Sequence, residues 1–160
     1  MTASPVSTKD LACRPPRSMA RAMPQSVQPS FLTASLLVAS GGAVGSWLRF
    51  TVGRLWVMAI GSVRAGAFPW GTLTVNIVGS LAMGLLVGWL ARFGTQGEAT
   101  RLLLAVGVLG GFTTFSSFSL EVVSLLQRGQ AGVALAYLAV SLLAGFGGLW
   151  LGLTMMRVSV

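Results

Sequence analysis

The chain has 160 residues, with 11 basic side chains, 3 acidic side chains, no histidine and one cysteine. Charged residues make up 9% of it, whereas an average soluble domain has about 25%. So few charges cannot cover a globular surface, so a soluble domain is nearly excluded and a membrane protein is indicated. The counts also exclude a histidine base and an intrachain disulfide, and Asp10, Glu98 and Glu121 leave little for paired acid–base catalysis. An enzyme is not expected.

The net charge of +8 does not indicate a nucleic-acid partner, because most arginines stand singly between long apolar runs. We expect these charges to influence membrane topology and to meet anionic lipid headgroups. Membrane lipid is therefore a predicted partner, and nucleic acid is not.

Four uncharged runs dominate the chain. They are Ala22–Leu48, Ala65–Ala91, Leu102–Leu120 and Gly129–Met156. Because a spanning helix needs about 20 mostly apolar residues, we predict transmembrane helices near 32–57, 71–92, 101–127 and 131–156. The fold class is thus an all-α integral membrane protein, with both termini on the same side. Trp56, Trp70, Trp89 and Trp150 lie near the predicted helix ends, as in an aromatic belt.

Residues 1–30 differ in composition from the rest. They contain four basic residues and five of the six prolines, which predicts a disordered basic N-terminal tail before a transmembrane domain at 31–160. A secretory signal is the alternative, but its apolar region would be too long. Met19 and Met23 leave open a later natural start.

The inter-helix loops are balanced in charge. One side carries Arg92, Arg101 and Arg157, and the other carries Arg54, Arg64 and Arg128. The positive-inside rule then gives almost no bias, so the chain could insert both ways and pair as an antiparallel, dual-topology homodimer. The basic tail opposes this hypothesis, because it would favour termini inside.

Glycine pairs at four-residue spacing predict close helix packing in lipid. Examples are Gly41/Gly45, Gly84/Gly88, Gly107/Gly111 and Gly148/Gly152. The third predicted helix also contains a double glycine followed by five hydroxyl residues within residues 113–119. Glycine, serine and threonine weaken a helix, so we infer a break near 110–116, where freed carbonyls could hold a cation. A continuous helix with a polar interface is the alternative.

Several polar or aromatic residues lie within the predicted spans. If the segment after the break is helical, Phe112, Phe115 and Phe118 stack at three-residue spacing, and an aromatic ring edge could meet an anion. Asn76, the only asparagine, could donate to an anion or form an interhelical hydrogen bond. Tyr137 and Ser141 share a face and could continue a hydroxyl track.

The two charged groups near the spans have open interpretations. Arg49 could simply snorkel or set topology. Glu121 alone could indicate a proton-coupled carrier, a helix cap or an ion pair with Arg128.

Together these residues resemble the Fluc (CrcB-type) family of small bacterial fluoride channels. The matching stretches are GGAVGSWLR at 41–49, GTLTVNIVG at 71–79 and GGFTTFSSFS at 110–119, followed by Glu121. The likeness covers roughly residues 32–157. It implies a fluoride-selective channel in the bacterial inner membrane that exports fluoride passively and confers fluoride resistance, built as an antiparallel homodimer with two pores.

The resemblance also implies roles for individual residues. Asn76 would donate to fluoride, and Phe115 and Phe118 would point ring edges at the ion. Ser117, Tyr137 and Ser141 would form the hydroxyl track along the pore. A structural sodium ion, the one implied cofactor, would bind backbone carbonyls at Gly110 and Thr113. Arg49 and Glu121 match characteristic charged positions, in a vestibule or in a structural role.

The chain departs from the family pattern in two places. Its basic tail is longer than usual, and Gly145 stands one turn past Ser141, where some members keep another hydroxyl. Two other function classes compete with a channel. Proton-coupled small multidrug carriers rely on a glutamate in the first span, whereas residues 22–48 contain no acid. A non-transporting assembly subunit would explain the glycine pairs but not the Thr/Ser/Phe run.

Overall fold

The structure is a computed structural model that describes residues 28–93 and 97–158. Most of the predicted basic tail therefore lies outside the described residues, as do the alternatives of a signal segment and a later start. The described part is all-helical and contains no strand. Its elements are α1 (Phe31–Ile60), α2 (Ser62–Ala67), α3 (Trp70–Phe93), α4 (Glu98–Thr100), the π-helical η2 (Arg101–Leu109), α5 (Gly110–Phe112), α6 (Phe115–Gln127) and α7 (Ala131–Val158).

Four segments of the described chain are long and apolar enough to cross a membrane. They are Phe31–Ile60, Trp70–Arg92, Glu98–Gln127 and Ala131–Met156, which confirms the four predicted spans. Ser30 caps the first helix by accepting a hydrogen bond from the Thr33 amide at 3.2 Å. Gly61, with φ of 81°, ends it. Between the first two predicted spans, the residues after Gly61 form the short helix α2.

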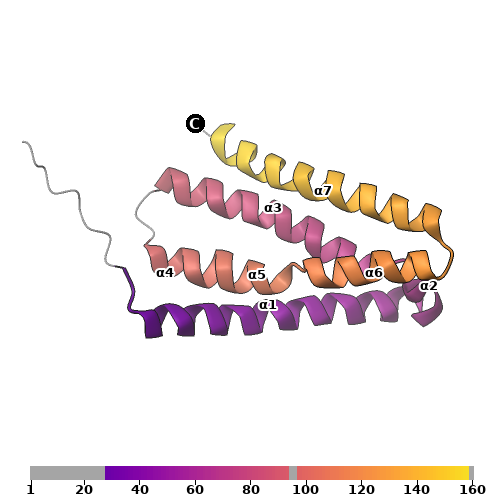
Figure 1. Ribbon diagram of the computed structural model, residues 1–160. Helices are drawn as coiled ribbons and strands as arrows, with labels where there is room; N and C mark the ends of the chain where they lie inside the picture. Colours follow the sequence, from indigo (N-terminus) through magenta and orange to yellow (C-terminus); the bar gives the residue numbers. More distant parts are fainter. Residues whose placement is uncertain (1–27, 94–96, 159–160) are drawn as a thin grey trace, which may run out of the picture.

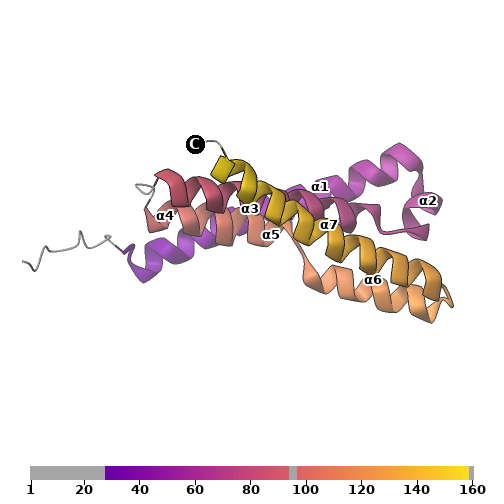
Figure 2. The same cartoon turned by 90° about the horizontal axis from the view of Figure 1, so that it is seen from above.

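The helices form two adjoining pairs. α3 lies beside α7, and α1 lies beside η2 and α5 (Figure 1). The described N-terminal end and the C-terminus lie at one end of the bundle, and α2 and the α6–α7 turn lie at the other (Figures 1 and 2). Because each span reverses the previous one, the pattern agrees with both termini on one side.

Glycines set how closely these pairs approach. A Cβ at Gly41 would lie 2.5 Å from the Leu103 carbonyl oxygen, and one at Gly111 would lie 2.6 Å from the Gly42 carbonyl oxygen. A Cβ at Gly152 would lie 2.5 Å from the Leu81 carbonyl oxygen, in the α3–α7 pair. The predicted close packing through glycines is confirmed, because these backbones leave no room for a side chain.

The backbone between α5 and α6 is extended. Thr113 has φ −79° and ψ 156°, and Thr114 has φ −151° and ψ 122°. α6 then begins at Phe115, with the Thr114 side chain accepting from the Ser117 amide. The extended pair lies beside α3, which brings it to Asn76.

Candidate functional site

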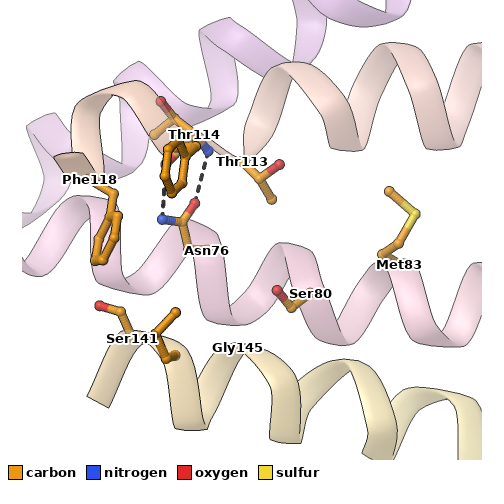
Figure 3. A pocket seen from close by; sticks show the side chains of 10 residues that line it. Asn76, Ser80, Met83, Thr113, Thr114, Phe118, Ser141 and Gly145 are labelled. Carbon is orange, nitrogen blue, oxygen red and sulfur yellow. Dashed lines mark hydrogen bonds between the residues drawn. The ribbon is translucent and has the colours of Figure 1, made fainter. Parts of the chain in front are cut away.

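Asn76 on α3 is hydrogen bonded to the backbone of Thr114 on both sides of its amide. Its Nδ2 donates to the Thr114 carbonyl at 3.1 Å, and its Oδ1 accepts from the Thr114 amide at 2.9 Å (Figure 3). The side-chain amide thus satisfies both the backbone N–H and the backbone C=O of Thr114, a residue that lies outside the flanking helices α5 and α6. Of the two roles left open for Asn76, the structure contains the interhelical hydrogen bond, and one Nδ2 proton remains for another acceptor.

The extended backbone also leaves the carbonyls of Gly110 and Thr113 without their usual helical donors. In a continuous helix, Gly110 would accept from the Thr114 amide, but that amide donates to Asn76. Thr113 would accept from the Ser117 amide, which instead donates to Thr114 Oγ1 at 3.2 Å. Arg49 Nη1 donates to the Thr113 carbonyl over a long distance of 3.5 Å.

A pocket of about 310 Å³ opens beside this segment. Asn76, Phe115, Phe118 and Ser141 line it, so it brings together four of the six residues predicted for an anion path. The complete lining is Asn76, Ser80, Met83, Thr113, Thr114, Phe115, Phe118, Ser141, Leu142 and Gly145 (Figure 3). None of these side chains carries a full charge, so the pocket can offer an ion only neutral groups.

The two phenylalanines differ sharply in exposure. Phe118 is 8% exposed and packs on Tyr137, with ring centroids 5.3 Å apart. Phe115 is 79% exposed although its ring centroid is only 6.0 Å from that of Phe118. Phe118 is therefore fixed by packing within the chain, whereas Phe115 projects from it.

Ser117 lies in a different pocket from Asn76. This second pocket, of about 430 Å³, contains Arg49, Thr72 and Glu121 as well as Ser117. Trp56 and Trp70 also line it and stack at a centroid distance of 5.4 Å. Arg49 and Glu121, the two charged residues singled out from the sequence, therefore line the same pocket.

Glu121 is held by two hydroxyl groups. Thr72 Oγ1 donates to one carboxylate oxygen at 2.7 Å, and the Tyr137 hydroxyl donates to the other at 2.8 Å. Arg128 instead donates to the carbonyls of Gly66 and Ser124. The ion pair between Glu121 and Arg128 that the sequence left open is therefore absent from the described residues. Tyr137, fully buried, points its hydroxyl at this carboxylate.

The sequence assigned no role to three residues that line the pocket beside Asn76 or bind Glu121. They are Thr72, Thr114 and Ser80, and the first two lie within the quoted motifs. Ser80 had a usable signal, because it follows Asn76 by four residues and therefore shares its helix face.

Side chains do not supply a metal site in the described part of the chain, which has no group of three or more His, Cys, Asp or Glu residues suited to one. A hard cation could be held there by backbone carbonyls, such as those left without helical donors at Gly110 and Thr113.

Comparisons with known proteins identify the family to which the chain belongs. Residues 36–153 match the family described as CrcB-like protein, Camphor Resistance (CrcB). The chain belongs to the CrcB family. The resemblance drawn from the three motifs is thereby confirmed, and the chain is a multi-pass bacterial membrane protein.

Three relatives in the CrcB family carry the name Fluoride-specific ion channel FluC. That of Novosphingobium aromaticivorans is 58% identical over 126 residues, which cover 79% of this chain and 98% of the relative. That of Rhodospirillum centenum is 47% identical, covering 78% and 96%. That of Chelativorans sp. (strain BNC1) is 54% identical, covering 72% and 93%. These names describe a channel and not an enzyme.

Proposed function

We propose that the chain is a fluoride-selective channel that lets fluoride leave the bacterial cytoplasm passively, across the inner membrane. The names of its CrcB relatives and its four spans support this function. The observation that carries it is the uncharged pocket lined by Asn76, Ser141 and two phenylalanine rings. Such an exit protects the cell, because fluoride enters as neutral HF and is trapped when HF dissociates inside.

The lining suits a small, strongly hydrated anion. The free Nδ2 proton of Asn76 and the Ser141 hydroxyl can replace hydrating water, and aromatic ring edges carry partial positive charge. A fixed arginine at the narrowest point would hold the ion, whereas neutral donors allow it to leave. Arg49 and Glu121 lie in the second pocket, where we place an entry vestibule.

The finer part of the proposal is an antiparallel, dual-topology homodimer. Phe115 projects from the protomer with 79% of its surface exposed, and no more than 28% of any span's most apolar window is buried within the chain. A second copy of the chain, packed against the surface from which Phe115 projects, would enclose the Phe115 and Phe118 rings. It would also cover the open side of the pocket beside Asn76. Cross-linking together with accessibility of tags on each terminus tests this arrangement, and a single orientation contradicts it.

We further propose that the extended Thr113–Thr114 segment breaks the third span at membrane depth and that a structural sodium ion binds there. The carbonyls of Gly110 and Thr113 have lost their helical donors, which supports the choice of ligands. Arg49 Nη1 reaches the Thr113 carbonyl only at 3.5 Å, and a hard cation would give both backbone oxygens a closer partner at membrane depth. The ion would stabilise the assembly and would not be transported.

The deciding experiment is flux from liposomes. Purified protein in liposomes loaded with fluoride, read with a fluoride electrode, is expected to release fluoride when the membrane is made permeable to a counter-ion. Chloride-loaded liposomes are expected to release almost none. Absent fluoride flux, or equal chloride flux, overturns the channel proposal.

A further inference from the structure

The pocket beside Asn76 adjoins a smaller pocket between α3 and α7, distinct from the pocket that contains Arg49 and Glu121. This space, of about 200 Å³, shares Ser80, Ser141, Leu142 and Gly145 with the larger pocket. Phe146 and Leu149 line its remaining wall. An ion that leaves Asn76 in this direction would therefore pass Ser80 and Ser141 before it meets an apolar lining.

Ser141 has an unsatisfied hydroxyl at this point. The residue is only 9% exposed, and its buried Oγ makes no hydrogen bond within 3.5 Å, although it lies near the Tyr137 hydroxyl. Buried hydroxyl groups are normally hydrogen bonded, so an orphan beside a pocket indicates a missing ligand or water. The group can rotate its proton toward whatever occupies the space.

Ser80 stands across the space from a residue with no side chain. It lies on α3 between Asn76 and Met83, opposite Gly145 on α7 (Figure 3). A Cβ built on Gly145 would lie 3.7 Å from Ser80 Oγ, which is ordinary van der Waals contact. α7 offers no polar group at this level, whereas α3 does.

We propose that Ser80 and Ser141 form a two-hydroxyl anion site, in which Ser80 supplies from α3 the donor that α7 lacks at Gly145. This inference rests on the proposed fluoride channel. It identifies the site that fluoride would occupy after it leaves Asn76. Ser80 lies one helical turn from Asn76 on the same face, so an anion can change partners over a short distance.

Hydroxyl donors fit the requirement of this position. The other side chains of this space are Leu142, Phe146 and Leu149, none of which has a hydrogen-bond donor to replace water around fluoride. Two neutral donors can bind a desolvated anion while still releasing it, since neither adds a full charge.

The test moves the hydroxyl from one helix to the other. Ser80→Ala is expected to lower fluoride flux about tenfold, the effect of losing one hydrogen bond to a charged group, whereas Ser80→Thr retains most of the flux. In the double variant Ser80→Ala/Gly145→Ser, the new hydroxyl enters the same space, and flux is expected to recover. Ser40→Ala, an exposed serine outside the described pockets, serves as the matched control.

The outcomes separate this inference from the proposed function. Wild-type protein without fluoride flux would overturn the channel itself. Wild-type flux that Ser80→Ala leaves unchanged would overturn only the Ser80 site. A loss that Ser80→Thr shares and Gly145→Ser does not reverse would also overturn it, because the hydroxyl would not be the cause. Size-exclusion chromatography checks that each variant keeps the same oligomeric state as the wild type.

Discussion

Replacement of Asn76 by aspartate is the sharpest perturbation of the proposed pore. The carboxylate can still accept from the Thr114 amide, now 2.9 Å from Oδ1. Its second oxygen replaces Nδ2, which now donates to the Thr114 carbonyl at 3.1 Å. Two oxygens then face each other, and the lost hydrogen bond costs about 1–3 kcal/mol of stability.

The effect on fluoride is larger than the effect on folding. Two like charges 4 Å apart repel by about 4 kcal/mol at an effective dielectric constant of 20, close to a thousandfold in rate. A half-buried carboxyl is partly protonated by the same environment, which reduces the repulsion. We therefore expect Asn76→Asp to lower fluoride flux at least about a hundredfold.

The assay is the fluoride-electrode liposome measurement, at equal protein reconstitution. Gln127→Glu makes the same amide-to-carboxylate change at the exposed end of α6, outside the described pockets, and is expected to conduct like the wild type. If Asn76→Asp also conducts like the wild type, then Asn76 does not face the ion path, and the assignment of its free Nδ2 proton is refuted.

Three further outcomes follow from the structure. Phe115→Ile should greatly reduce flux while size-exclusion chromatography shows the oligomeric state of the wild type, because the exposed ring is not a core contact of the chain; unchanged flux would remove Phe115 from the pore. Gly45→Val should abolish folded protein, since a Cβ there would lie 2.7 Å from the Phe112 amide nitrogen; Gly132→Val, in open space, is the control, and equal yields would contradict the packing argument. Replacing sodium by a large organic cation during purification should lower thermal stability, and restored sodium should recover it; indifference to sodium would refute the proposed site.

The apolar runs were sufficient to predict the four spans. Hydrophobic length depends on local sequence alone, so it could be read without tertiary information. The glycine pairs were readable for a similar reason, since only backbone contact explains small residues at that spacing in lipid. The short helix α2 was missed because its six residues carry no apolar period strong enough to distinguish a helix from a loop.

The partners of the polar side chains could not be read in the same way. Asn76 and Thr114 are 38 positions apart, and Thr72 and Glu121 are 49 apart. Helical periodicity tells which residues share a face, but it does not tell which helices are neighbours or at what height they meet. The residues of the predicted hydroxyl track therefore lie in two different pockets: Ser117 shares one with Arg49, and Ser141 shares the other with Asn76.

The Thr114 peptide connects the two proposed ion sites. Its amide has a single proton, and donating it to Asn76 withholds it from the Gly110 carbonyl. Asn76 therefore both presents a donor to the proposed anion path and exposes a ligand for the proposed cation. Aspartate keeps the acceptor that draws this amide away, whereas leucine at the same position has none. Asn76→Leu should accordingly lose both fluoride flux and sodium-dependent stability, whereas Asn76→Asp should lose the flux and keep the response to sodium.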